Sequence, residues 1–193
     1  MTDAATLQEL LRTFQRSAWR LEARDRYQAD DQVRAYLRGD PTPPPMTHSF
    51  AKYLENLRAM PAQGRTIGRV HAIVGPLSPY LRYELEWGYS LTAEAGDDVH
   101  ILHRPRWEDT LFGAQPSDFW IFDDAVVAVM NYADNGDWLG LELVREADAV
   151  AEYRAIQQLA LRDAIALRAY LTVLRTTPID PTALLSRPET IAR

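Results

Sequence analysis

The stretch from Asp118 to Val127 constrains the fold more than any other part of this sequence. It reads Asp-Phe-Trp-Ile-Phe-Asp-Asp-Ala-Val-Val, so four large apolar residues run into two aspartates and then into a second apolar run. Aspartate favours tight turns, and apolar runs that flank such a turn are typical of paired antiparallel strands. The stretch therefore predicts a β-hairpin with strands near 118–122 and 125–132.

Other segments predict further strands of the same sheet. They lie near residues 66–74, 99–103 and 138–143, and the last of them follows a turn at Asn135-Gly136. In the first of these strands, Val70 and Ala72 share one face, whereas Arg69 and His71 point to the other. This alternation predicts a strand with one wholly apolar face and one that carries charge.

Apolar residues at helical spacing predict helices near 6–18, 30–39, 50–57, 80–87 and 147–175. Thr6-Leu7-Gln8-Glu9 has the form of a capping box, and Ser78-Pro79 is a typical helix opening. Residues 17–22, Ser-Ala-Trp-Arg-Leu-Glu, have two interpretations. They either continue the first helix or form an extended segment that turns Arg20 and Glu22 to the face opposite Trp19 and Leu21.

The order of these elements predicts an α+β fold. Strands that are joined mostly by hairpins favour a mixed or mainly antiparallel sheet, packed on one face by the N-terminal helices and a long C-terminal helix. The chain has 193 residues, which suits one domain over residues 1–178. Pro178, Pro181 and Pro188 indicate a proline-containing tail over residues 179–193.

Composition excludes several classes of function. The chain has no cysteine, which excludes disulfides, thiolate nucleophiles and iron–sulfur clusters. A formal net charge of -6 makes direct nucleic-acid binding unfavourable, since surfaces that bind nucleic acid are usually basic. The sequence contains no apolar run of membrane-spanning length and no basic signal-peptide start, so we expect a cytoplasmic protein without a membrane partner.

Four motifs together resemble an uncharacterised family of actinobacterial proteins, a domain of unknown function. They are Ser-Ala-Trp-Arg-Leu-Glu at 17–22, Gly-Pro-Leu-Ser-Pro-Tyr-Leu-Arg-Tyr-Glu-Leu at 75–85, Glu-Ala-Gly-Asp-Asp-Val at 94–99 and Asp-Phe-Trp-Ile-Phe-Asp-Asp at 118–124. The resemblance covers roughly residues 14–165. It implies a bacterial cytoplasmic protein, often encoded near helix-turn-helix regulators or within secondary-metabolite clusters, and it implies no reaction or catalytic residue.

Polar and aromatic residues of these motifs form the candidate site. Glu22, Glu84 and Asp123 are candidate acids or bases, because burial can raise a carboxyl pKa. The candidate ligand-binding residues are Arg20, Tyr27, Tyr80, Arg82, Trp120 and Asp124. Each has a structural alternative: Arg20 with Glu22 and Arg82 with Glu86 as ion pairs, the Asp-Asp pair as a turn, and the aromatic rings as core.

No metal or cofactor is expected. His71 lies on a different predicted strand from His100 and His103, and the last two would point to opposite faces of theirs. The glycines form neither a dinucleotide-binding nor a phosphate-binding loop, and no serine lies in a nucleophile-elbow motif.

Two hypotheses follow. The first is a binding protein, possibly regulatory, that holds a small anionic molecule through Arg20 and Arg82 or pairs with a small cognate protein as a homo- or heterodimer. The alternative is a cofactor-free tailoring enzyme of secondary metabolism, in which a carboxylate moves a proton during an elimination or an intramolecular cyclisation.

Overall fold

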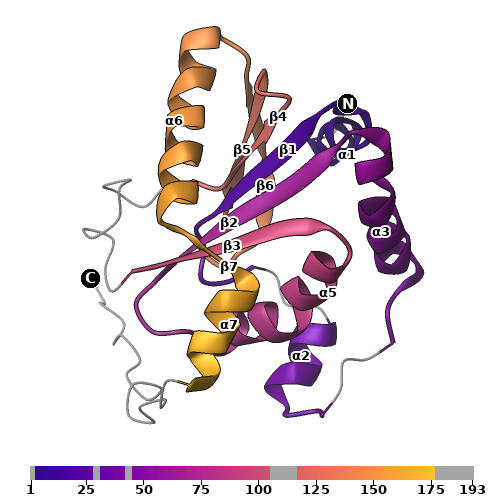
Figure 1. Cartoon of the computed structure of the whole chain (residues 1–193), viewed down its shortest axis with the longest axis vertical. Helices are drawn as coiled ribbons and strands as arrows, with labels where there is room; N and C mark the ends of the chain where they lie inside the picture. Colours follow the sequence, from indigo (N-terminus) through magenta and orange to yellow (C-terminus); the bar gives the residue numbers. More distant parts are fainter. Residues whose placement is uncertain (1–2, 28–30, 42–44, 105–116, 177–193) are drawn as a thin grey trace.

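The structure is a computed structural model, and it describes residues 3–27, 31–41, 45–104 and 117–176. One mixed sheet forms the centre of this part of the chain (Figure 1). Its strands are β1 (Ser17–Glu22), β2 (Thr66–Val74), β3 (Asp97–Arg104), β4 (Phe119–Phe122), β5 (Val126–Tyr132), β6 (Trp138–Val144) and β7 (Ile165–Ala166). Their order is β6-β5-β4-β1-β2-β3-β7, with β1, β2 and β3 parallel and the other pairings antiparallel.

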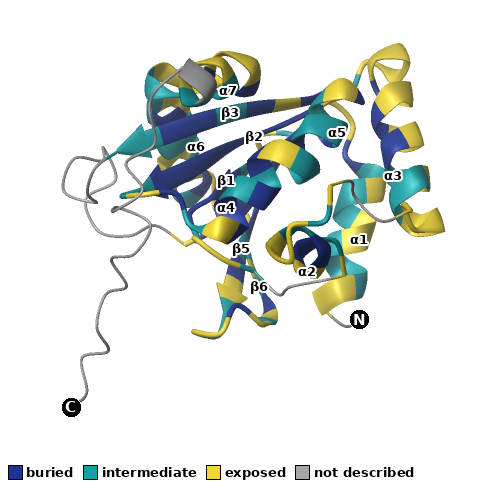
Figure 2. Cartoon of the chain, turned by 90° about the horizontal axis from the view of Figure 1, so that it is seen from below, coloured by how far each residue is buried: buried dark blue, intermediate teal, exposed yellow. Residues whose placement is uncertain are grey.

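Helices cover both faces of this sheet, so the expectation of helices on one face is wrong. The helices are α1 (Asp3–Thr13), α2 (Asp31–Leu37), α3 (His48–Ala59), α4 (Pro79–Tyr83), α5 (Tyr89–Glu94), α6 (Ala147–Asp163) and α7 (Leu167–Thr176), with a short 3-10 turn η1 (Pro61–Gln63) and a π-helical turn η2 (Glu84–Gly88). Figure 2 shows the buried strands between α6 on one side and α4 and α5 on the other. The α+β class and the single domain are confirmed for the described residues.

The segment 17–22 is the extended alternative. As β1, it directs Trp19 and Leu21 into the core beneath α6, together with Val70 and Ala72 of β2. The opposite face of β1 therefore carries Arg20 and Glu22, as the extended interpretation required. The N-terminal helix occupies Asp3–Thr13 and so begins before the predicted capping box.

Both predicted hairpins are present. Asp123 and Asp124 have positive φ values of 54° and 59°, which is typical of a type I′ turn between β4 and β5. Gly136, with φ 89°, supplies the turn between β5 and β6. The sheet register is therefore fixed by turn chemistry that the sequence already carries.

The predicted helix over 147–175 is two helices. The chain extends at Ala164, and Ile165 and Ala166 pair with Ile101 and His100 on the outer edge of β3 before α7 begins. The apolar spacing that continues across the break serves two different cores, because α6 packs on β1 and β2 while Leu167 and its successors pack near β3 and α5.

The predicted tail over residues 179–193 lies outside the described residues.

Candidate functional site

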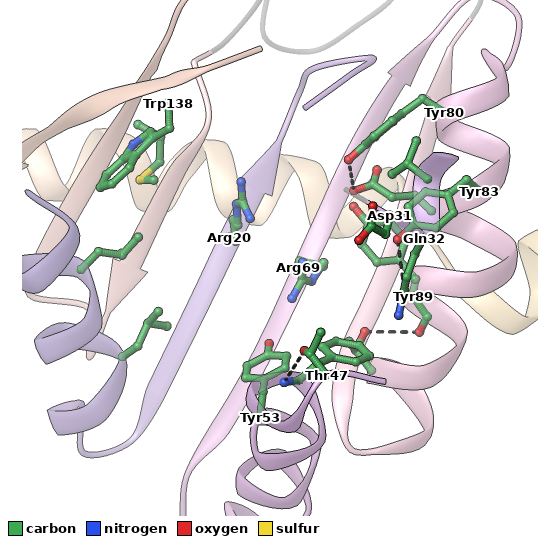
Figure 3. Close-up of a pocket in the computed structure, with 18 of the residues that line it drawn as sticks. Arg20, Asp31, Gln32, Thr47, Tyr53, Arg69, Tyr80, Tyr83, Tyr89 and Trp138 are labelled. Carbon is green, nitrogen blue, oxygen red and sulfur yellow. Dashed lines mark hydrogen bonds between the residues drawn. The ribbon is translucent and has the colours of Figure 1, made fainter. Parts of the chain in front are cut away.

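A cavity of about 750 Å3 opens on the sheet face opposite α6. Its floor is formed by β1, β2, β4 and β5, and α1, α3, α4 and α5 contribute to its walls (Figure 3). Aromatic side chains make up much of the lining: Phe50, Tyr53, Tyr80, Tyr83, Tyr89, Trp120, Tyr132 and Trp138. Arg20, Arg69 and Glu84 supply charged groups, so the cavity combines apolar walls with a few convergent polar groups, as small-molecule sites do.

The parallel pairing of β1 and β2 brings four polar residues together on the cavity face. Arg20 lies opposite Arg69, and Glu22 lies opposite His71. Glu22 is almost fully buried, and its Oε1 atom lies 2.5 Å from Arg20 Nη1 and 3.2 Å from Arg69 Nη1. One carboxylate therefore bridges two guanidinium groups.

Two further carboxylates complete this network. Asp118 Oδ2 lies 3.2 Å from Arg20 Nη2, and Asp97 Oδ2 lies 2.6 Å from Arg69 Nη2. Asp118 also accepts hydrogen bonds from the backbone N–H of Ala23 and from the hydroxyl of Tyr27. Each guanidinium thus faces two carboxylates, so neither arginine offers an unbalanced positive charge to the cavity.

The charges of this network decide the pKa of Glu22. Burial by itself would raise the pKa, but the positive charges of Arg20 and Arg69 outweigh it and lower the pKa to about 2. Glu22 is therefore ionised at any physiological pH, and it acts as a fixed negative charge inside the protein.

Glu84 behaves in the opposite way. It is the first residue of the π-helical turn, its side chain is 13% exposed, and it lines the cavity. Tyr80 donates a hydrogen bond to its Oε1, whereas its buried Oε2 has no hydrogen-bond partner in the structure. Burial and the nearby charge of Glu22 raise the pKa of Glu84 to about 8, so this carboxyl is mostly protonated at neutral pH.

His71 lies directly behind Glu84 and is fully buried. Its Nε2 atom is 3.0 Å from the carbonyl oxygen of Arg24, which can only accept, so Nε2 carries a proton. Burial lowers the pKa of His71, and a neutral ring with a proton on Nε2 must accept at Nδ1.

Two hydroxyl-type donors compete for that Nδ1 atom. Tyr89 lies 2.7 Å away, but its hydroxyl also donates to the ionised Glu22. Glu84 Oε2 lies 3.4 Å from the same nitrogen. A phenol has a single proton, so Tyr89 can donate it to Glu22 or to His71 Nδ1 but not to both at once.

Two carboxyl groups in one site therefore have pKa values pushed in opposite directions. This is the pattern by which enzymes keep one carboxyl as an anion and a second as a proton donor. The arrangement can deliver a proton from Glu84 to a bound molecule, or remove one from it, beside a charge that does not itself titrate.

The structure brings together six of the nine residues named from the sequence. Arg20, Glu22, Tyr27, Tyr80, Glu84 and Trp120 all line the main cavity or the smaller hollow that adjoins it. Arg20 also lies over the rings of Tyr27 and Trp120, at 5.5 Å and 5.6 Å from their centres. Arg20 and Glu22 do form the ion pair of the structural alternative, and that pair is part of the site.

Arg82, Asp123 and Asp124 lie elsewhere. Arg82 is not among the residues that line the cavity or the adjoining hollow, and its positive charge opposes the burial that raises the pKa of Tyr36 and Tyr170. Glu86 accepts a hydrogen bond from Tyr36. Asp123 accepts hydrogen bonds from three backbone N–H groups at residues 15–17, and Asp124 pairs with Arg154 of α6. The two aspartates thus have the turn and surface roles of their structural alternative.

Five residues of the site are not among the candidates named from the sequence: Arg69, His71, Tyr89, Asp97 and Asp118. The charged face of the 66–74 strand was a usable signal for Arg69 and His71, because a polar face on a buried strand needs partners. Asp97 and Asp118 had no such signal, since their approach to the arginines depends on sheet order. Tyr89 had none either, since its approach depends on how α5 packs on the sheet.

The described residues contain no group of three or more histidine, aspartate or glutamate side chains that could hold a metal ion. None of the helices in the described part of the chain is both long and apolar enough to cross a membrane.

No curated protein sequence matches the chain significantly. A family model, the domain of unknown function DUF6879, matches residues 5–172. That range includes every residue of the site described above, and the chain belongs to this uncharacterised family.

Proposed function

We propose that the protein is an enzyme that binds a small organic molecule in the cavity and exchanges a proton with it through Glu84. The observation that carries this proposal is the position of the Glu84 carboxyl. It lines an open cavity, and its inner oxygen lies 3.4 Å from His71 Nδ1 without a hydrogen bond of its own. A largely buried carboxyl in such surroundings is a common feature of acid–base sites.

The proton transfer requires only groups that the chain supplies. As a general acid, Glu84 gives its proton to a developing anion on the bound molecule and becomes a carboxylate. As a general base, the Glu84 carboxylate takes a proton from the bound molecule. Glu22 stays ionised throughout, and Arg20 and Arg69 hold it in place. Elimination and intramolecular cyclisation, the reactions expected of a tailoring enzyme, each include such a proton transfer: in an elimination the base removes a proton, the C–H electron pair forms the new π bond, and the leaving group departs with its own pair.

Binding can be tested by fluorine NMR on protein labelled with fluorotryptophan. Trp120 and Trp138 line the cavity, whereas Trp19 faces α6 on the other side of the sheet and is an internal control. A collection of small molecules sorted by charge is screened, and the three resonances are assigned among the five tryptophans with Trp19→Phe, Trp120→Phe and Trp138→Phe. A true ligand shifts Trp120 or Trp138 and leaves Trp19 unchanged.

Turnover is then tested on each ligand by mass spectrometry, with wild-type protein and Glu84→Gln. The amide keeps the size of the side chain but cannot exchange a proton. Conversion by the wild type, with conversion by Glu84→Gln lower by at least about a hundredfold, supports the enzyme. Equal conversion by the two proteins contradicts it. If no molecule in the collection shifts Trp120 or Trp138, cavity binding itself fails.

A non-enzymatic binding protein is the second candidate. It is favoured by the network of Arg20, Arg69 and three carboxylates, whose charged groups already form ion pairs with one another and need no reaction to explain them. A ligand that shifts the cavity tryptophans and is recovered unchanged supports this candidate. An anionic ligand, a cognate protein partner, a dimer, a cytoplasmic location and a role in secondary metabolism are further proposals, and the paired arginines weigh against the anion.

A further inference from the structure

The charges around the cavity favour a particular class of ligand. Arg20 contacts Glu22 and Asp118, and Arg69 contacts Glu22 and Asp97. Three carboxylates therefore surround two guanidinium groups. Even with Glu84 protonated, the network carries one more negative charge than positive.

An anion that entered this cavity would meet the excess negative charge and would find each guanidinium already neutralised. The Nε atoms of both arginines have no hydrogen-bond partner but are buried, so a carboxylate or phosphate would have to displace Glu22, Asp97 or Asp118 from an arginine. Those three side chains are buried, so a displaced carboxylate would be left without its partner at a large free-energy cost. A cation meets no such obstacle.

The walls of the cavity suit a cation as well. Tyr80 of α4 and Trp138 of β6 line, together with Glu84, the smaller hollow that adjoins the main cavity, and the Tyr80 hydroxyl donates to Glu84. Aromatic faces attract ammonium groups, and rings around a carboxyl are a recurring way to bind them. We propose, on the basis of the proposed small-molecule function, that the ligand carries a cationic nitrogen that binds between these rings and the carboxyl of Glu84.

Binding of a cation has a consequence for the proton on Glu84. The positive charge stabilises the carboxylate, so Glu84 ionises and its proton is released to the solvent. The groups that face Glu84 from the surrounding elements are Arg20, Glu22, Arg69, His71, Tyr80, Tyr89 and Tyr27. Glu22 and the arginines keep their charge near neutral pH, and burial keeps His71 neutral and raises the tyrosine pKa values. Glu84 is therefore the group that titrates between about pH 6.5 and 8.5.

Three probes that share a benzyl or phenyl ring test the charge of the ligand: benzyltrimethylammonium, benzyl alcohol and benzoate. Isothermal titration calorimetry with the full chain measures each affinity. We expect the cation to bind most tightly and benzoate most weakly, with Glu84→Gln weakening the cation by at least about tenfold. Asp124→Asn also replaces a carboxyl group with an amide, but in a surface turn, and it should leave all three affinities within about twofold.

The pH dependence gives a readout that does not require a variant to fold. The quaternary ammonium has no proton to lose, so its affinity for wild-type protein should rise by about tenfold between pH 6.5 and 8.5 as Glu84 ionises. Titrations near neutral pH in two buffers of different ionisation enthalpy should show up to one proton released per cation bound.

Tighter binding of benzoate than of the cation overturns the cation proposal, and so does equal binding of all three probes. Either result leaves the cavity intact as a small-molecule site. Failure of the cation alone to bind, while other molecules still shift Trp138, also overturns only the cation proposal. A different result contradicts the proposed function: no molecule of any charge shifts the fluorine resonance of Trp120 or Trp138.

Discussion

At the scale of single residues, Asp123 and Asp124 are identical neighbours whose side chains have different roles. Asp123 and Asp124 both have positive φ, which costs free energy in any residue with a side chain. The carboxylate of Asp123 compensates by accepting from the backbone N–H groups of Gln15, Arg16 and Ser17 at 2.7–3.0 Å. Asp123 thereby anchors the start of β1 to the β4–β5 turn, and with it the strand that carries Arg20 and Glu22.

Glycine substitutions separate these two effects, because glycine removes the backbone strain at both positions. Asp123→Gly also loses three hydrogen bonds, so we expect a net loss of about 1–3 kcal/mol in the free energy of unfolding. Asp124→Gly loses only its exposed pair with Arg154 and should change stability by no more than about 0.5 kcal/mol. Urea unfolding measures both, and an equal effect at the two positions would contradict the anchoring role.

At the scale of elements, close packing between β2 and β3 holds Asp97 beside Arg69. Gly68 lies opposite Asp98 in the parallel register, and a Cβ atom at Gly68 would lie 3.0 Å from the Asp98 carbonyl oxygen and 3.2 Å from its Cβ. The two strands must separate slightly to admit a methyl group. In the π-helical turn, by contrast, a Cβ at Gly88 would meet only Glu84 Cγ, at 3.8 Å.

The same substitution should therefore have opposite signs in the two elements. Gly68→Ala should destabilise the protein by about 1–3 kcal/mol through overpacking. Gly88→Ala should stabilise it by about 0.5–1 kcal/mol, since its φ of -69° suits alanine and glycine is a poor helix former. Thermal unfolding of the two variants is the measurement, and a stabilising Gly68→Ala would show that the sheet has room there.

An element can be predicted from the sequence when the residues that determine it are neighbours in the chain. The hairpins and the Ser78-Pro79 helix start depend on residues within one turn, and Ser78 Oγ does accept from Leu81 N at 3.1 Å. The break between α6 and α7 depends instead on the open edge of β3, which pairs with Ile165 and Ala166. Helical spacing cannot reveal a distant strand edge, so the sequence predicts one helix where two exist.

At the scale of the whole molecule, the site depends on sheet order. Strand alternation places Arg20 and Glu22 on one face, and that much was available from the sequence. Asp118 lies about a hundred positions along the chain from Arg20, and it reaches this arginine because β4 pairs with β1. Asp97 lies about thirty positions from Arg69, and it reaches this arginine because β3 pairs with β2. Because these charged groups lie on several strands, a change in their protonation must affect the free energy of unfolding of the whole protein.

The pH dependence of stability tests this coupling. The pKa of Glu84 is raised from 4.5 to about 8 on folding, so the folded protein binds more protons over that range and loses stability as the pH rises. The pKa of His71 is lowered from 6.5, so its contribution is lost only as the pH falls below 6.5. Glu22, with a pKa of about 2, contributes no slope at neutral pH.

Between about pH 6.5 and 8, Glu84 alone among these three groups gives a slope. We expect the free energy of unfolding to fall by about 2 kcal/mol across that range in the wild type. Glu84→Gln mimics the protonated side chain and has no proton to release in this range, so its stability should change little there. Asp124→Asn should keep the wild-type slope. A Glu84→Gln protein with an undiminished fall would show that another group holds the proton, because the only difference between the two proteins is the carboxyl that can release it.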